Sequence, residues 1–276
     1  MRPLEALLLI ITLAALLAFA VRRFRAVRRT RFLPTAALLA LSAQVLLEGA
    51  RWQMATAYAV SVLLFLISLL RQSGPGESVE PGRLRRLGRG LAIGLGAVAL
   101  ALAAFLALTF PVFNFPQPHG PYQIGTLTYD WVDAGRPEIF RADPSDRREL
   151  MVQVWYPVQG SKSTKRAPYV NDGYALAPLA RLLHLPGFIF QYLKYIKTNA
   201  IPGASVAPGT ATYPVLVFSH GRGGFRQHNT AQVEELVSHG YIVAAIDHTY
   251  AAAGVVFPDG RLASLRRPHA RSQVRG

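Results

Sequence analysis

The feature that most constrains the fold of this 276-residue chain is a series of four apolar runs in its first 110 residues. We expect helices at about residues 4–21, 32–50, 52–70 and 91–110. An α-helix rises about 1.5 Å per residue, so roughly 20 residues cross the ~30 Å hydrocarbon core of a bilayer. The whole chain is 51% hydrophobic and only 16% charged, which is too apolar for an ordinary soluble protein. Residues 1–110 are therefore predicted to form an α-helical membrane region of about four transmembrane helices.

The arginines between these runs predict how the region is oriented. Two linkers are rich in arginine, whereas the opposite side carries only Arg2 and Arg51. The linker arginines are Arg22, Arg23, Arg25, Arg28, Arg29 and Arg31 in the first, and Arg71, Arg83, Arg85, Arg86 and Arg89 in the second. Positive charge favours the cytoplasmic side. We expect a multi-pass protein of the cell membrane whose N-terminus and whose residues after Phe110 are extracytoplasmic.

Several motifs in this region have a simpler interpretation than the one they first suggest. The arginine run can contact lipid headgroups, and between two membrane spans it does not predict a nucleic-acid partner. Residues 1–20 resemble a signal peptide, but the arginines directly behind them favour a retained span. Glu48 and Arg51 are expected to be a solvated cap on a helical hairpin.

The chain changes character after Phe110, and residues 111–276 are expected to form part of an α/β domain with a mixed sheet. Residues 123–133 and 149–158 alternate apolar and polar side chains and predict a strand hairpin. Residues 174–198 predict two short helices, separated at Pro186. A further small hairpin is expected at 255–263, around a Pro-Asp-Gly turn.

The most informative unit lies between these elements, at residues 213–248. "YPVLVFSH" predicts a strand buried on both faces, and "YIVAAIDH" predicts a second buried strand. The intervening "RQHNTAQVEELVSHG" predicts a helix that ends at Gly240. A strand, helix and strand in this order form a right-handed crossover with a parallel strand pair.

The turn "HGRGG" after the first of these strands resembles the oxyanion-hole turn of α/β-hydrolases. When an ester carbonyl is attacked it becomes an oxyanion, which backbone N–H groups stabilise. Gly221, Gly223 and Gly224 let the backbone approach without a Cβ. His220 is expected to hold the turn through a hydrogen bond.

Four segments in order, "GPYQIGTLTYDWVD", "DPSDRRELMVQVWYPV", "YPVLVFSHGRGGF" and "LVSHGYIVAAIDH", resemble the platelet-activating factor acetylhydrolase family. The resemblance runs from about Gly120 to about Gly260. It implies an α/β-hydrolase fold and a serine esterase that removes short or oxidised sn-2 acyl groups from phospholipids. It also implies that the backbone N–H of Arg222 is an oxyanion donor. The family often has an apolar residue there, which leaves substrate preference open.

The catalytic triad implied by this resemblance has no counterpart in the 276 residues. They contain no G-x-S-x-G motif, and in this fold the serine, acid and histidine follow the strand that ends at Asp247. Ser219 and His220 are neighbours on a strand, so they point to opposite faces and cannot pair. His248 ends a strand at the edge where ligands bind in such sheets, whereas His228 and His239 are expected to be solvated. We expect this chain alone to be inactive.

No metal site or cofactor is expected, because the chain has no cysteine and no H-E-x-x-H motif. The leading hypothesis is the N-terminal part of a membrane-anchored serine esterase acting on phospholipid or other esters. Two alternatives stay open: a non-catalytic membrane protein or degenerate gene product, and an α/β-hydrolase of the dienelactone or polyester type.

Overall fold

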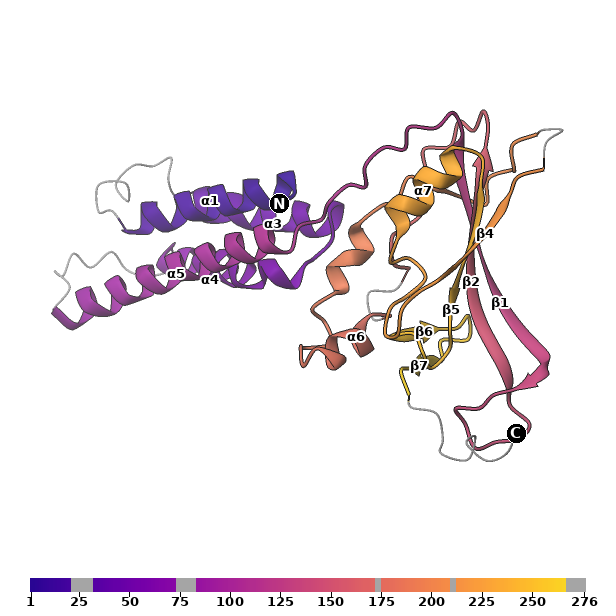
Figure 1. Cartoon of the computed structure of the whole chain (residues 1–276). Helices are drawn as coiled ribbons and strands as arrows, with labels where there is room; N and C mark the ends of the chain where they lie inside the picture. Colours follow the sequence, from indigo (N-terminus) through magenta and orange to yellow (C-terminus); the bar gives the residue numbers. More distant parts are fainter. Residues whose placement is uncertain (21–31, 73–82, 172–174, 209–211, 267–276) are drawn as a thin grey trace. The chain divides into compact units, whose positions relative to one another are not determined.

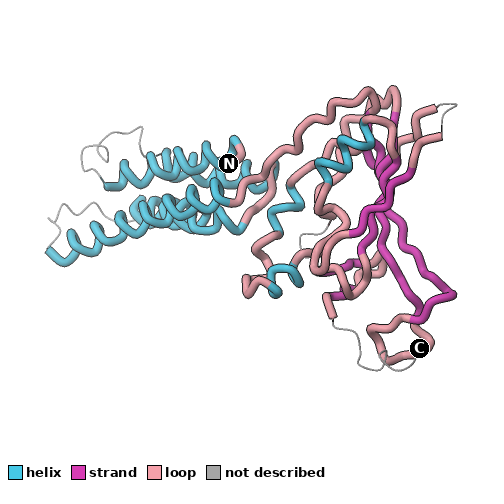
Figure 2. Tube along the Cα trace, viewed as in Figure 1, coloured by secondary structure: helices cyan, strands magenta, loops and turns pink. Residues whose placement is uncertain are grey.

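The computed structural model describes residues 1–20, 32–72, 83–171, 175–208 and 212–266. It divides into two compact units, Met1–Val112 and Phe113–Gly276. The first is helical and the second contains all the described strands, as Figure 2 shows. The arginine-rich linker at 22–31, on which the predicted orientation depends, lies outside the described residues.

The first unit is built from four long helices that pack through small and apolar side chains. They are α1 (Pro3–Ala20), α3 (Leu33–Leu47), α4 (Ala55–Gln72) and α5 (Arg83–Thr109), with a short 3₁₀ turn η2 (Trp52–Met54) before α4. Three stretches are long and apolar enough to cross a membrane: Pro3–Ala20, Trp52–Leu70 and Arg86–Thr109. The second expected span is shorter than predicted, because α3 has only 15 residues and the chain turns at Gly49, whose φ is +82°.

One end of this helical unit contains a buried ionic cluster, and here the sequence-based expectation was wrong. Arg51 is only 3% exposed, and its guanidinium donates to both carboxylate oxygens of Glu5, at 2.9 and 3.1 Å. Arg51 also donates to the carbonyl of Phe110 at the end of α5. The hairpin cap was expected to be solvated. Instead, Arg51 is buried, and its charge is neutralised by Glu5, which lies 46 residues earlier in the sequence.

The second unit is built around a five-stranded mixed sheet of order β3-β1-β2-β5-β4 (Figure 1). Its strands are β1 (Gln123–Pro137), β2 (Arg147–Val158), β3 (Ile201–Pro202), β4 (Val215–Ser219) and β5 (Ile242–Asp247). β1 and β2 form the predicted antiparallel hairpin, and β2 also pairs antiparallel with β5. β4 and β5 form the predicted parallel pair, and helix α7 (Thr230–Ser238) connects them along the chain.

Helix α7 covers one face of this sheet and forms its core. Val233 and Val237 of α7 pack on Trp155 of β2 and on Val243 and Ala245 of β5. These residues recur at helical and strand spacing, which is why the sequence predicted the elements. The helix ends at Gly240, whose φ of +96° requires glycine.

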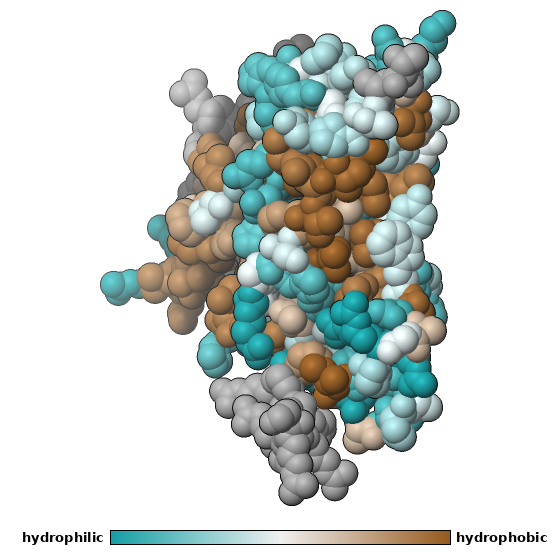
Figure 3. Space-filling model, turned by 45° about the vertical axis from the view of Figure 1, so that its right-hand side comes forward, coloured by the Kyte–Doolittle hydropathy of each residue, from teal (hydrophilic) through white to brown (hydrophobic). Residues whose placement is uncertain are grey.

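Part of the opposite sheet face is exposed, at β4 and along β1, and this corrects the expectation that β4 is buried on both sides. β4 is an edge strand, with Val215 62% and Val217 68% exposed. Tyr129 and Trp131 of β1 are also exposed, and their rings stack at 5.7 Å. Figure 3 shows hydrophobic surface gathered on the side of the sheet away from α7. An apolar strand is buried on both faces only when it lies inside the sheet and a layer of helices or strands covers each face.

The remaining described elements agree with the sequence. α6 (Ala177–Leu182) and the 3₁₀ helix η3 (Gln191–Tyr195) are the two short helices predicted on either side of Pro186. β6 (Gly254–Val256) and β7 (Leu262–Ser264) form the predicted small hairpin after β5.

Candidate active site

The residues singled out in the sequence lie at the carboxyl ends of β4 and β5. His220 follows β4 directly and is only 9% exposed. Its Nδ1 lies 2.8 Å from the carbonyl oxygen of Gly221, and its Nε2 lies 3.2 Å from the backbone nitrogen of His248. The carbonyl can only accept and the backbone N–H can only donate. The ring is therefore a neutral tautomer with its proton on Nδ1.

Backbone hydrogen bonds hold the rest of the turn. Gly223 N–H donates to the carbonyl of Ala251 and Gly224 N–H to that of Gly221, at 2.9 and 2.8 Å. Ala253 N–H in turn donates to the carbonyl of Gly224. The turn is thus attached to the segment that follows β5, as well as to its own strand.

Two backbone donors of the turn are left over. Within the described ranges, no hydrogen bond engages the N–H of Gly221 or of Arg222. The Arg222 side chain is directed elsewhere, with Nη2 3.3 Å from the carbonyl oxygen of Arg266. Free N–H groups in a held turn are what an oxyanion requires.

The three glycines of the turn differ in what they contribute. Gly223 has a φ of +77°, a conformation that residues with a Cβ rarely adopt. A Cβ on Gly224 would lie 3.0 Å from the carbonyl oxygen of Gly221 and 3.1 Å from His220 Cβ. A Cβ on Gly221 would meet nothing within 4 Å. The turn therefore demands glycine at 223, is tight at 224 and has space at 221.

A buried ion pair fixes the segment after the turn. Asp247, at the end of β5, accepts the backbone N–H of Arg226 at 2.6 Å and also binds the Arg226 guanidinium. Both side chains are less than a tenth exposed. From the sequence, Asp247 was expected only to end a strand. Its buried carboxylate proves to connect the strand end to the start of the α7 segment.

The structure also brings together two residues that the sequence analysis did not pair. Ser219 Oγ lies 2.7 Å from His248 Nε2, and the serine is exposed. Ser219 and His220 do point to opposite sides, one exposed and one buried. The signal that could have found the pair is the parallel register, because Ser219 lies opposite Ile246, two residues before His248.

Of the other histidines noted in the sequence, His228 borders the turn, because its Nδ1 would lie 3.3 Å from a Cβ on Gly224. His228 is exposed and stacks on Phe225 at 5.4 Å, and His239 is exposed beside Glu235. In the part of the chain that the structure describes, no group of three or more acidic or histidine side chains could hold a metal ion.

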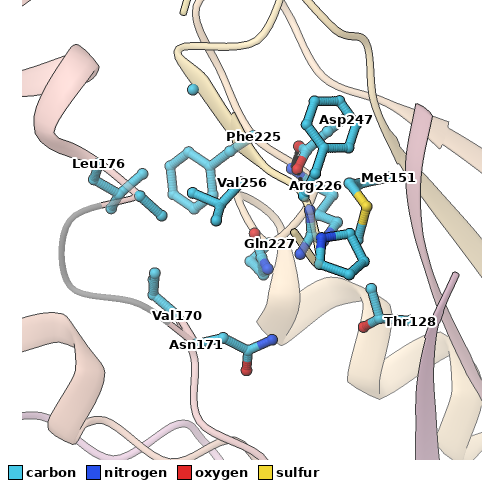
Figure 4. Close-up of a pocket in the computed structure, with 14 residues that line it drawn as sticks. Thr128, Met151, Val170, Asn171, Leu176, Phe225, Arg226, Gln227, Asp247 and Val256 are labelled. Atoms are coloured by element: carbon cyan, nitrogen blue, oxygen red, sulfur yellow. Dashed lines mark hydrogen bonds and ion pairs between the residues drawn. The ribbon is translucent and has the colours of Figure 1, made fainter. Parts of the chain in front are cut away.

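A cavity of about 230 Å³ opens beside the turn, on the α7 side of the sheet (Figure 4). Its apolar wall includes Met151 of β2, Leu176, Phe225, Val256 and Phe257. Its polar wall includes Thr128, Gln227 and the Arg226–Asp247 pair. In Figure 4, Leu176 lies across the cavity from Met151 and Thr128, with Gln227 between them. A mostly apolar cavity with a few polar groups suits a small ligand with one polar end.

Comparisons with known proteins identify a family for this chain. The family model described as platelet-activating factor acetylhydrolase, isoform II, matches residues 108–262, more than half of the chain. The platelet-activating factor acetylhydrolase of Gallus gallus is 28% identical over 152 residues, covering 52% of this chain and 32% of that protein. The enzyme of Canis lupus familiaris is 28% identical over 150 residues, covering 52% and 30%.

A solved ferulic acid esterase from Streptomyces cinnamoneus is 37% identical, with a TM-score of 0.44, over 56% of this chain and 41% of that one. The chain spans about a third of the length of the curated relatives it matches. The family match covers β1 to the start of β7, including the His220–Gly224 turn, the crossover and the cavity. The chain, with its mixed-sheet α/β-hydrolase-like unit, thus belongs to the platelet-activating factor acetylhydrolase family, isoform II.

Proposed function

We propose that residues 113–276 supply the oxyanion turn and part of the substrate cavity of a carboxylic-ester hydrolase that acts on short acyl esters of phospholipids. The observation that carries this proposal is the held turn at His220–Gly224, with two unengaged N–H groups beside a mostly apolar cavity. Membership of a family whose members include acetylhydrolases of a phospholipid supports the substrate class.

In this proposal the Arg222 N–H is the oxyanion donor, and Gly221, Gly223 and Gly224 with His220 keep it in position. One preorganised donor contributes roughly 3–4 kcal/mol to stabilising the transition state. A backbone donor does not depend on the side chain, so arginine at 222 is compatible with the role. The side chain instead adds positive charge near the site, which favours esters carrying a phosphate.

These residues do not contain the nucleophile motif that the family resemblance implies. Because the 276 residues contain no G-x-S-x-G motif, we expect the chain alone to bind substrate but not to turn it over. Because three helical stretches are long and apolar enough to cross a membrane, we propose that the α/β unit acts at a lipid surface on the extracytoplasmic side. Its partners are then the lipids of that leaflet.

Binding of a substrate analogue tests the proposal without needing catalysis. We would titrate the detergent-solubilised chain, labelled with ¹⁵N-arginine, with an ether phospholipid carrying a non-hydrolysable short sn-2 chain. The Arg222 amide resonance is expected to shift in a saturable manner. Val256→Phe, which fills the cavity, is expected to weaken binding at least about tenfold, whereas Val206→Phe, at an exposed position, should not.

A saturable shift that ignores Val256→Phe would place the lipid outside the cavity and contradict the proposal. Competition distinguishes the substrate class. If a soluble short-chain ester displaces the lipid analogue at equal concentration, the site recognises the acyl group alone and not a phospholipid.

A further inference from the structure

Ser219 and His248 form a hydroxyl–imidazole pair for which the proposed function has no use. Ser219 ends β4 and His248 follows β5, and the parallel register places their side chains at the same edge of the sheet. The 2.7 Å separation of Ser219 Oγ and His248 Nε2 is within hydrogen-bonding distance. This is the spacing expected between a nucleophile and its general base.

The surroundings of His248 keep its ring neutral. Partial burial lowers the pKa of His248 below its usual 6.5, and electrostatic interaction with His220 and with the positive charge of Arg148 lowers it further. Asp247 acts in the opposite direction but is already bound to Arg226. A neutral ring can accept the serine proton at Nε2, which a protonated ring could not do.

The hydroxyl is also accessible, and the turn with unengaged donors begins just after it in the chain. Ser219 is exposed on the side of the sheet away from α7, so an acyl donor can reach it. The chain then passes directly through His220 into the turn that carries the unengaged N–H groups of Gly221 and Arg222. Nucleophile, base and oxyanion donors therefore lie within a few residues of two adjacent strand ends.

We propose that Ser219 is a nucleophile, activated by His248, that accepts an acyl group from an activated ester. The Ser219 Oγ–H proton passes to His248 Nε2 while Oγ bonds to the carbonyl carbon, giving a tetrahedral oxyanion. The bond from that carbon to the leaving oxygen then breaks, and the proton passes from Nε2 to the leaving oxygen. The products are an alcohol and an ester on Ser219, with no change in oxidation state.

The Ser219–His248 pair lacks the carboxylate that would stabilise a protonated histidine during fast turnover. Within the described residues, no carboxylate hydrogen-bonds to Nδ1 of His248, and the positive charge of Arg148 disfavours the imidazolium that each proton transfer creates. Removing the carboxylate from a complete triad lowers kcat by roughly 10⁴-fold. We therefore expect slow, stoichiometric acylation and a long-lived adduct. The inference rests on the proposed function only in sharing its oxyanion turn.

The test is covalent labelling of the whole chain in detergent, with a fluorophosphonate probe and with p-nitrophenyl acetate. Peptide mass spectrometry should locate both adducts on Ser219. Ser219→Ala should abolish them, and His248→Gln should slow labelling at least about 100-fold, the smallest usual contribution of a general base. Ser205→Ala and His239→Gln change exposed residues away from the pair and should label at the wild-type rate.

A pH profile gives a readout that a purely structural pair would not produce. The labelling rate should rise through a midpoint below pH 6.5, because the base works only when neutral, and His248→Gln should remove that midpoint. Unchanged thermal unfolding of Ser219→Ala would show that the loss of label is not unfolding. An adduct on another residue, equal labelling of Ser219→Ala, or no adduct on folded chain would each overturn the proposal.

The outcomes also separate this inference from the proposed function. Loss of the adduct while the ether lipid still shifts the Arg222 amide would refute the Ser219 proposal alone. An adduct on Ser219 in a chain that does not bind the ether lipid would support it and refute only the phospholipid substrate.

Discussion

The Arg226–Asp247 pair allows the most quantitative prediction about how the segment after the His220–Gly224 turn is held. Asp247→Asn keeps the size of the side chain and one oxygen for the Arg226 N–H, but removes the negative charge. Arg226 would then be a buried cation, only 9% of its side chain being exposed, without its counter-ion. Breaking a buried pair from one side costs about 3–5 kcal/mol.

For a unit of this size each kcal/mol lowers Tm by roughly 2–4 °C. Asp247→Asn should therefore lower the unfolding temperature of residues 113–276 by roughly 6–20 °C. The assay is the thermal change in fluorescence of the buried Trp155, followed in the detergent-solubilised chain. Hydrogen exchange at residues 221–226 should speed up at temperatures where the rest of the unit stays folded, because the pair fixes that segment.

An exposed pair provides the matched control. Asp259 and Arg261 also form an ion pair, but about half of each side chain is exposed. Asp259→Asn should cost less than about 1 kcal/mol, the usual range for surface pairs. Arg226→Met combined with Asp247→Asn should cost clearly less than the sum of the two single changes. If Asp247→Asn and Asp259→Asn had equal effects, the argument that burial makes the first pair essential would be refuted.

Three further predictions concern other buried or constrained groups. Burial raises the pKa of Glu234 above its usual 4.5, so the folded state holds the proton more tightly. Stability should therefore fall as pH rises from about 4.5 through the raised pKa, and Glu234→Gln should remove this fall in urea titrations at pH 4–8. A wild-type chain whose stability matches that of Glu234→Gln across this range would contradict the assignment. Gly223→Ala should destabilise the unit by about 1–2 kcal/mol, because its φ of +77° disfavours a Cβ, whereas Gly221→Ala has open space and should cost under about 0.5 kcal/mol in the same titration. Arg51→Gln should destabilise the helical unit by about 1.5–3 kcal/mol in detergent unfolding, because Glu5 loses its hydrogen bonds to Arg51 but keeps its ion pair with Arg2; combined with Glu5→Gln it should cost less than the sum of the two single changes, and strictly additive costs would argue against the pair.

The sequence predicted well those features that depend on neighbours in the chain. The β1–β2 hairpin, the β4-α7-β5 crossover and the β6–β7 hairpin follow from side-chain periodicity and from glycine and proline positions. The turn at His220–Gly224 was predicted in the same way, because the residues that form it are consecutive in the sequence. The four long helices of the first unit were predicted from composition, although α3 ended at Leu47, earlier than its apolar run suggested.

Tertiary structure alone decided the features that depend on partners far along the chain. Arg51 looked solvated until Glu5 was brought beside it, and β4 looked doubly buried until the sheet order made it an edge. The Ser219–His248 pair joins residues 29 positions apart, and only the register of two parallel strands sets their distance. Local sequence determines which element a segment forms, whereas its exposure, charge and reactivity depend on what the fold places against it.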